Sequence, residues 1–182
     1  RDERGLVRLV PSSGGLATAL RAPHEQSGGL WFGWAGDLEG ASAGERNEIE
    51  AELRRLRAVP ITISQREIAH YYDGFSNGVL WPLLHYLIDK VRLDAERDFT
   101  VYQEINRRFA AAIAKEYRPG DVIWIHDYQL ALVPGYLRRL LPEAAIGFFL
   151  HVPFPSAEVF RILPWREEIL RGLLGADLIG FH

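Results

Sequence analysis

The sequence predicts an α/β protein with a mostly parallel sheet and helices on both of its faces. Three short apolar runs, at 122–125, 145–150 and 178–181, are separated by sequence with helical spacing. Apolar strands that alternate with helices pair in parallel, because each crossover helix returns the chain to the same end of the sheet. Each run leads into a polar residue, at His126, His151 and His182. We therefore expect a doubly wound fold whose strand ends carry polar side chains.

The first third of the chain predicts shorter elements. Residues 5–10 alternate like a strand, residues 11–15 form a turn, and a helix begins over Leu16–Arg21. The segment GLWFGW (29–34) predicts a second strand, with glycines where another backbone comes close. The polar stretch 37–58 predicts a loop followed by a solvated helix. VPITI (59–63) predicts a strand whose proline suits a sheet edge.

The remaining two thirds predict longer helices between the apolar runs. Ser64 and Glu67 have the spacing of a capping box, so a helix should begin there. An amphipathic helix is expected to end near 118–120, because apolar residues recur at helical spacing at Tyr102, Ile105, Phe109 and Ile113. Helical sequence also follows the first run, over 130–141, and the second run, through Leu174.

Composition fits one globular domain spanning 1–182 and excludes several other classes of protein. Of its 182 residues, 48% are apolar and 25% charged, enough to bury a core. A net charge of −3 offers no basic surface for nucleic acid or an anionic membrane. No apolar run approaches the ~20 residues of a membrane span, and the lack of cysteine suits a reducing cytoplasm. Because the chain starts at Arg1 and contains no methionine, we expect it to be part of a longer protein.

The ends of the three apolar runs are the first candidate site. Ligands of open parallel sheets bind beyond the carboxyl ends of the strands, where this chain has His126, Asp127, His151 and His182. The Asp127 carboxylate can accept hydrogen bonds from sugar hydroxyls. Equally, it can act as the N-cap of the segment starting at Tyr128, and both roles can hold at once.

The segment HYYDGFSNGVLWPLLHY (70–86) is too aromatic, and too interrupted by glycine, to predict a plain core helix. Tyrosine and tryptophan offer flat apolar faces with one polar group, which suits sugar binding. We favour packing roles for Phe75, Leu80 and Leu84. For Tyr72 and Trp81, sugar binding and packing are both open.

Other patterns are weaker or missing. Ser13-Gly14-Gly15 before a helix could offer free N–H groups to a phosphate, but on this pattern alone an ordinary turn is the better explanation. It has the spacing of neither a Walker loop nor a dinucleotide fingerprint. The histidines have no metal-ligand spacing, and there is no Gly-x-Ser-x-Gly sequence, so we expect no metal and no serine nucleophile.

Six phrases of the sequence, taken in order, resemble the trehalose-6-phosphate synthase family. They cover nearly the whole chain and are SGGL (13–16), WFGWAG (31–36), YYDGFSNGVLWPLLHY (71–86), DVIWIHDYQL (121–130), IGFFLHVPFPSAEVFR (146–161) and ADLIGFH (176–182). The resemblance implies the N-terminal, acceptor-side half of a GT-B glycosyltransferase, in which two Rossmann-like domains enclose the active site.

The resemblance also implies a reaction and its partners. That family transfers glucose from UDP-glucose, or another nucleotide-glucose, to glucose 6-phosphate with retention at the anomeric carbon and without a metal or cofactor. The partners would therefore be a nucleotide sugar, a sugar phosphate and the chain's own C-terminal domain. A homo-oligomer is left open.

Specific residues match the family's motifs. Tyr72, Trp81 and Trp34 match aromatic residues of the acceptor site, and Asp127 matches an aspartate that binds acceptor hydroxyls. His151 matches a histidine beside the transferred glucose, where it can stabilise charge as the glycosidic bond breaks. His126 and His182 are expected to be framework.

On the donor side, Gly14 and Gly15 match the family's glycine pair beside the donor diphosphate.

The departures from the family pattern set the alternatives. The family's first strand leads into Ser-Asn-Arg, whose arginine grips the acceptor phosphate, and nothing here matches it; Gln129 stands where histidine is frequent. The nucleotide-binding C-terminal half is also missing, so the chain alone is expected to be inactive. A relative with another acceptor (a glucosylglycerol-phosphate synthase or a cyclitol pseudo-glycosyltransferase) and a non-catalytic sugar-phosphate sensor stay open. Intact Asp127 and His151 favour an enzyme.

Overall fold

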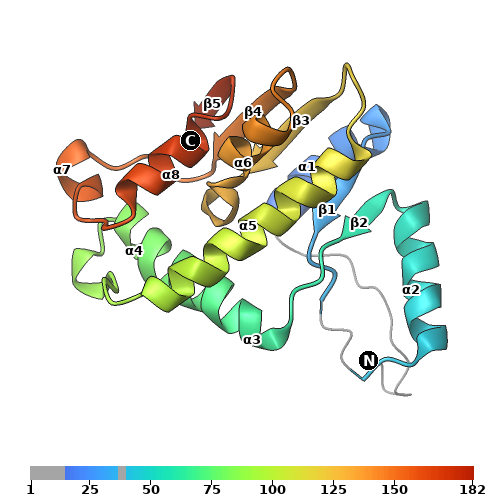
Figure 1. The fold of residues 1–182 in the computed structure, drawn as a ribbon, viewed down its shortest axis with the longest axis horizontal. Coiled ribbons are helices and arrows are strands. Elements are labelled where there is room, and N and C mark those ends of the chain that lie inside the picture. Colours follow the sequence, from blue (N-terminus) through green and yellow to red (C-terminus); the bar gives the residue numbers. More distant parts are fainter. Residues whose placement is uncertain (1–14, 37–39) are drawn as a thin grey trace. The chain divides into compact units, whose positions relative to one another are not determined.

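The computed structural model describes residues 15–36 and 40–182, which form two compact units, 1–64 and 65–182. Each unit is α/β with parallel strands (Figure 1), as the sequence predicts. The predicted strand 5–10 and the Ser13-Gly14 turn lie outside the described residues. No helix in the described ranges is long and apolar enough to cross a lipid bilayer.

The described part of the first unit, residues 15–36 and 40–64, contains two helices and a two-stranded parallel sheet. Its elements are α1 (Gly15–Ser27), β1 (Trp31–Gly33), α2 (Ala43–Arg55) and β2 (Ala58–Pro60). The ladder pairs Trp31 with Ala58 and Gly33 with Pro60, so both strands are edges and the proline is tolerated. The predicted strand at 59–63 is thus shorter and starts earlier, while the predicted helix at 16–21 extends to Ser27.

The solvated helix expected within 37–58 is α2, and a capping box starts it. The Ser42 hydroxyl accepts from the Glu45 N–H, and the Glu45 carboxylate accepts from the Ser42 N–H. The two bonds satisfy donors that the first helical turn leaves unpaired.

The second unit is built on three parallel strands in the spatial order β3-β4-β5. The strands are β3 (Val122–His126), β4 (Ala145–Leu150) and β5 (Leu178–Phe181), which confirms the three predicted runs. Between them lie η3 (Tyr128–Leu130), α6 (Val133–Leu140), α7 (Ala157–Phe160) and α8 (Arg166–Leu173).

The two crossovers, which contain α6 and α8, lie side by side (Figure 1). Strands in sequential order with right-handed crossovers put both helices on the same face. Glycines permit the close contact: a Cβ on Gly135 would meet the Arg171 carbonyl oxygen at 2.9 Å, and one on Gly172 would meet the Ala131 carbonyl oxygen at 2.5 Å. Along β4, Ile146, Phe148 and Leu150 are buried, whereas the intervening residues are partly exposed.

Helix α5 (Glu96–Glu116) is the predicted amphipathic helix. It packs on α6 and on the helical segment Ala69–Leu80 (Figure 1). Its buried stripe consists of Asp98, Phe99, Tyr102, Ile105, Asn106, Phe109 and Ala110. Arg108 ties α5 to α3 (Gln65–Ile68) through its ion pair with Glu67 at 2.7 Å. The helix expected at Ser64–Glu67 therefore begins at Gln65.

The aromatic segment is a π-helix, η1, over Ala69–Leu80, and it continues into α4 (Trp81–Leu84) and η2 (Ile88–Lys90). Twelve residues of π-helix are unusual, since most occur as single turns inside α-helices, frequently at functional sites. The prediction that this is no plain core helix is confirmed. The packing roles are confirmed as well, with Phe75, Leu80 and Leu84 exposed by 0%, 2% and 6%.

Candidate active site

Three of the predicted polar residues meet at the carboxyl ends of β3 and β4. His126 is the last residue of β3, Asp127 follows it, and His151 follows β4. The Asp127 N–H donates to the Phe149 carbonyl at 2.8 Å, so the pairing of the two strands extends to the aspartate. The parallel register therefore places Asp127 beside His151, as the strand pattern predicts.

Asp127 has a strained backbone and caps the next helix. Its φ of 71° and ψ of 167° fall in a region that is essentially reserved for glycine and costs about 1–3 kcal/mol. Oδ1 accepts from the N–H of Tyr128 at 3.0 Å and from the N–H of His151 at 3.4 Å. The N-cap role is confirmed. Within the described ranges no hydrogen bond involves Oδ2, which leaves this oxygen for a ligand hydroxyl.

His126 and His151 form a hydrogen-bonded pair. Nδ1 of His126 lies 3.1 Å from Nε2 of His151, and the rings are 5.3 Å apart between centroids. Burial, and then the neighbouring His151, lower the pKa of His126 from 6.5 to about 4, so its imidazole is neutral at neutral pH. His126, expected to be framework, thus orients the His151 ring. His182 only extends the sheet, through its N–H bond to the Leu150 carbonyl at 3.1 Å.

Tyr128 connects the strand ends to η1. Its hydroxyl donates to Oδ1 of Asn77 at 3.2 Å, across 51 residues of sequence. Burial raises the pKa of Tyr128, and the charges of Asp127 and Tyr72 raise it further. The bond to Asn77 joins η1, the helix that also carries Tyr72, to the residue after Asp127. No sequence pattern singles out Asn77 or Tyr128 as functional, although both lie inside segments that resemble the family.

Two buried polar side chains of α5 hold the loop after Asp127. The Tyr102 hydroxyl donates to the Tyr128 carbonyl at 2.6 Å and accepts from the Ala131 N–H at 3.1 Å. Asn106 donates to the Gln129 carbonyl at 3.0 Å and accepts from the Leu132 N–H at 3.1 Å. Both side chains are fully buried, so each satisfied bond rigidifies the loop.

Tyr72 on η1 and Trp81 at the start of α4 are 43% and 39% exposed, while the residues directly before them, Tyr71 and Leu80, are buried. Trp81 stacks on His85 with ring centroids 4.2 Å apart, and His85 Nδ1 lies 2.7 Å from the Trp81 carbonyl oxygen. Both aromatic residues are therefore accessible, and Trp81 is also held by its stacking partner, which favours the sugar-binding alternative over packing.

The other predicted residues belong to the first unit. The Trp34 indole N–H donates to the Ile63 carbonyl at 3.2 Å, and its ring is 40% exposed. Gly15 is the first residue of α1, and a Cβ placed there would meet no atom within 4 Å. Gly14 lies outside the described residues.

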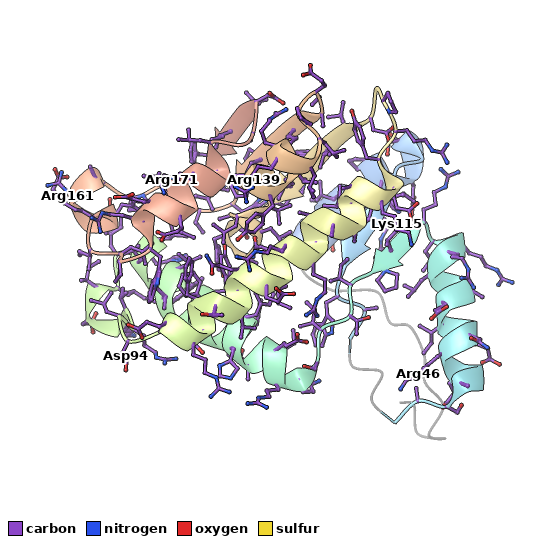
Figure 2. All side chains as sticks on the ribbon, viewed as in Figure 1. Arg46, Asp94, Lys115, Arg139, Arg161 and Arg171 are labelled. Atoms are coloured by element: carbon purple, nitrogen blue, oxygen red, sulfur yellow. The ribbon has the colours of Figure 1, made fainter. Side chains whose placement is uncertain are left out.

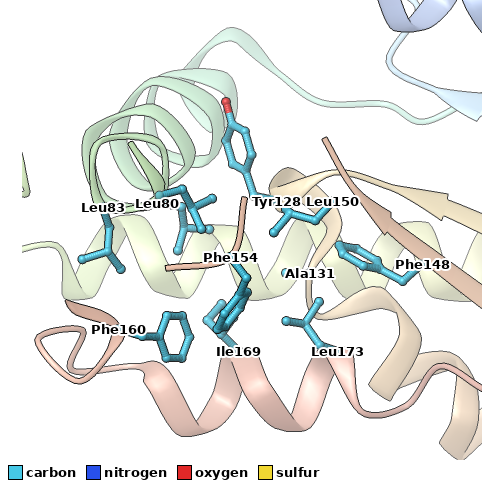
Figure 3. A pocket seen from close by; sticks show the side chains of 11 residues that line it. Leu80, Leu83, Tyr128, Ala131, Phe148, Leu150, Phe154, Phe160, Ile169 and Leu173 are labelled. Atoms are coloured by element: carbon cyan, nitrogen blue, oxygen red, sulfur yellow. The ribbon is translucent and has the colours of Figure 1, made fainter. Parts of the chain in front are cut away.

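Tyr128 also lines a small apolar cavity (Figure 3). Its volume of about 20 Å³ suffices for one water at most. Tyr128 lines it with its ring, while its hydroxyl points away from the other lining side chains (Figure 3). This cavity belongs to the core and is too small to hold a sugar.

A larger depression of about 260 Å³ lies between α5, α6 and α8, lined in part by Arg107, Arg139 and Arg171. Figure 2 labels Arg139 and Arg171 on the side of α6 and α8. Arg107 is 3.8 Å from Glu104, Arg171 is 3.1 Å from Glu167, and Glu168 also lines the depression. Two of the three arginines are thus paired with glutamates, and Arg139 lies over the Tyr136 ring, 4.9 Å from its centroid.

The cluster at the strand ends offers sugar-binding chemistry. Asp127 supplies an open carboxylate oxygen, Tyr72 and Trp81 supply ring faces, and His151 supplies an imidazole held by His126. No group of three potential metal ligands gathers within 15–36 and 40–182. The structure is thus an α/β domain with polar side chains at its strand ends and exposed aromatic rings on η1 and α4, groups whose chemistry suits a carbohydrate.

Comparison with known sequences identifies the family. The chain belongs to Glycosyltransferase family 20, whose profile matches residues 1–182. It is 47% identical over 178 residues to the trehalose-6-phosphate synthase of Mycolicibacterium gilvum, covering 98% of this chain and 35% of that protein. The same enzyme of Mycolicibacterium smegmatis is also 47% identical, with 98% and 34% covered. The chain thus spans about a third of the length of these relatives.

Comparison with solved structures points to the same family as the sequence comparison. A trehalose-phosphate synthase of Burkholderia vietnamiensis matches with a TM-score of 0.76 and 35% identity, over 93% of this chain and 37% of that chain. The Burkholderia xenovorans enzyme in complex with glucose 6-phosphate matches with a TM-score of 0.77 and 33% identity, over 96% and 38%. An Escherichia coli structure bound with UDP-2-fluoro glucose matches with 0.76 and 33%, over 96% and 38%. The predicted family and fold are confirmed.

Proposed function

We propose that this chain is the acceptor-side part of a retaining glucosyltransferase that makes trehalose 6-phosphate from UDP-glucose and glucose 6-phosphate. The observation that carries the proposal is the pair of Asp127 and His151 at the ends of β3 and β4, joined through Tyr128 and Asn77 to η1, which carries the exposed Tyr72. The similar enzymes from Burkholderia xenovorans and Escherichia coli, solved with glucose 6-phosphate and with UDP-2-fluoro glucose, support both substrates.

In this proposal Asp127 binds the acceptor sugar. Its free Oδ2 accepts a hydrogen bond from a hydroxyl, while Oδ1 stays bound to the N–H groups of Tyr128 and His151. Because those bonds fix the carboxylate before the ligand arrives, little ordering entropy is lost on binding. Tyr72 and Trp81 contact the sugar through their exposed ring faces.

His151 acts on the transferred glucose. Its Nε2 is engaged by His126, so Nδ1 is the nitrogen that can face a ligand. A preorganised donor at the reacting sugar stabilises charge that develops as the bond to the leaving diphosphate breaks. On the donor side, Gly14 and Gly15 contribute backbone N–H groups to the diphosphate, and Trp34 adds a further aromatic face near the acceptor.

The remaining substrate contacts come from a second domain, which we propose follows this one in the full-length protein. The chain spans 35% of the Mycolicibacterium gilvum enzyme, so 182 residues supply only part of the active site. We expect the isolated chain to be inactive, the full-length enzyme to need no metal or cofactor, and the reaction to take place in the cytoplasm. Assembly into a homo-oligomer is compatible with this proposal.

Transfer by the full-length protein tests the proposal. UDP release from UDP-glucose is followed with glucose 6-phosphate or glycerol 3-phosphate as acceptor. The proposal requires turnover with glucose 6-phosphate, formation of trehalose 6-phosphate, and no change on adding a chelator. Preference for glycerol 3-phosphate would instead assign a glucosylglycerol-phosphate synthase. Binding of the sugar phosphate with no transfer would assign a sensor.

A further inference from the structure

The π-helical geometry of η1 places Tyr72 and Trp81 on one face. Nine residues separate them, which in an α-helix of 3.6 residues per turn would put them on opposite sides. A π-helix has i→i+5 bonds and roughly 4.4 residues per turn, so nine residues make about two full turns. The Trp81 N–H donates to the Ser76 carbonyl, five residues back, so π bonding reaches the tryptophan.

The burial pattern follows the same period. Tyr71, Phe75, Leu80 and Leu84 are buried at steps of four or five residues, and these side chains form the inner face of the segment. Tyr72 and Trp81 each come one position later and are exposed. An α-helical register through this segment would turn one of the two rings into the core.

A buried carboxylate on α5 holds η1 in this form. Asp98 is 6% exposed, and its Oδ1 lies 2.6 Å from Nδ1 of His70, the second residue of η1. Its Oδ2 is 3.2 Å from Nη1 of Arg92. The carboxylate occupies the place where a Cβ on Gly74 would stand, 2.6 to 2.9 Å from that point. Only glycine at this position lets Asp98 rest on the helix backbone.

Arg92 extends the contact to the next turn of η1. Its N–H donates to the Gly78 carbonyl at 3.0 Å, and its Cδ lies 3.4 Å from where a Cβ on Gly78 would be. The Asp98–Arg92 pair therefore contacts η1 at three residues, His70, Gly74 and Gly78. These three positions lie between and beside the residues that carry the exposed rings.

We propose that Asp98, with His70 and Arg92, is a positioning group for the acceptor: it keeps η1 π-helical, and so keeps Tyr72 and Trp81 aligned for one sugar phosphate. None of the three is placed against substrate, and they act through the helix. This inference rests on the proposed function, because it names the device that shapes the acceptor site of that enzyme.

Asp98→Asn in the full-length protein tests the inference, since it keeps the shape of the side chain and removes its charge. We expect KM for glucose 6-phosphate to rise about tenfold, because small displacements of positioning groups are costly. KM for UDP-glucose should stay within about twofold of wild type. Gly74→Ala, which displaces the carboxylate, should show the same split. Amide hydrogen exchange over 69–81 should quicken in both variants.

Asp177→Asn is the matched control. Asp177 also bonds an arginine, Arg138, at 2.8 Å, and a backbone N–H, that of Ile146, at 2.8 Å, but it lies before β5. The Asp177→Asn variant should keep both KM values at the wild-type level, even if its Tm is lower. If Asp98→Asn raises both KM values equally, or leaves both unchanged while exchange over 69–81 quickens, the positioning role is overturned. A wild-type enzyme that does not use glucose 6-phosphate would instead refute the proposed function, while the exchange data still report whether Asp98 holds η1.

Discussion

The two halves of the candidate site hold their functional side chains in different ways. At the strand ends, backbone pairing between β3 and β4 puts Asp127 and His151 side by side. On η1, by contrast, a buried carboxylate on another helix keeps an unusual backbone that aligns Tyr72 and Trp81. The first arrangement is built into the parallel sheet, whereas the second depends on a few charges. We therefore expect the backbone at the strand ends to keep its position when side chains are substituted, and the backbone of η1 to shift.

Asp127→Gly gives the largest expected effect and separates function from stability at the strand ends. Glycine relieves the strain at φ 71° and costs only a few tenths of a kcal/mol as a helix cap. Transfer should fall by about 10³-fold, while Tm stays level or rises by a few degrees. Thermal unfolding and steady-state kinetics on the same preparation check this. A large drop in Tm would mean that the carboxylate is needed for folding.

His151→Ala should lower kcat by about 10² if the imidazole stabilises charge in the transition state. KM for glucose 6-phosphate should change little, because Asp127 and the η1 rings remain in place. The measurement is steady-state kinetics with each substrate varied in turn. A kcat close to wild type would leave His151 with a structural role only.

The His126–His151 pair predicts a pH dependence of stability. Because the pKa of His126 is lowered to about 4, the unfolded chain takes up this proton at higher pH than the folded chain does. The contribution of this lowered pKa to the free energy of unfolding is fully present above about pH 6.5 and is lost as the pH falls toward about 4.

With a discount for partial exposure of the ring, the loss is about 1–2 kcal/mol. Urea unfolding of the full-length protein at pH 5 and pH 7.5 measures it. His126→Gln should flatten the difference between the two pH values. If the His126→Gln variant loses as much stability between pH 7.5 and pH 5 as the wild type does, the pH dependence of stability comes from other groups.

Tyr128→Phe gives the smallest effect and tests the one hydrogen bond shown to join the two halves. The variant loses the bond to Asn77, whose net value is about 0.5–1.5 kcal/mol, so KM for glucose 6-phosphate should rise about three- to tenfold. Asn77→Ala should give the same change, and the double variant should add nothing more. Additive losses in the double variant would show that the two residues act separately.

The sequence predicts the strand-end half of the site well, because apolar runs that end in polar residues reveal a parallel sheet and its binding edge. The run VIWI before His126 and GFFL before His151 were enough to place Asp127 with His151. The Ser42–Glu45 capping box, which starts the helix expected within 37–58, likewise has a recognisable local spacing.

The η1 half could not be predicted in the same way. Glycines and aromatic residues indicate that 70–86 is no ordinary helix, but its π form depends on Asp98, which sits 24 residues after Gly74 in the sequence. The positive φ of Asp127 and the Tyr128–Asn77 bond likewise depend on contacts between segments that are far apart in the sequence. Tertiary contacts decide these features, and no local pattern encodes them.

If this chain forms the acceptor side of the enzyme, the Trp81→Ala variant of the full-length protein should bind the acceptor more weakly and the donor as before. Calorimetric titration should show glucose 6-phosphate binding weakened about tenfold or more, the loss of one buried aromatic contact, with UDP-glucose affinity within about twofold of wild type. Equal weakening of both ligands, or unchanged binding of glucose 6-phosphate, would contradict the account.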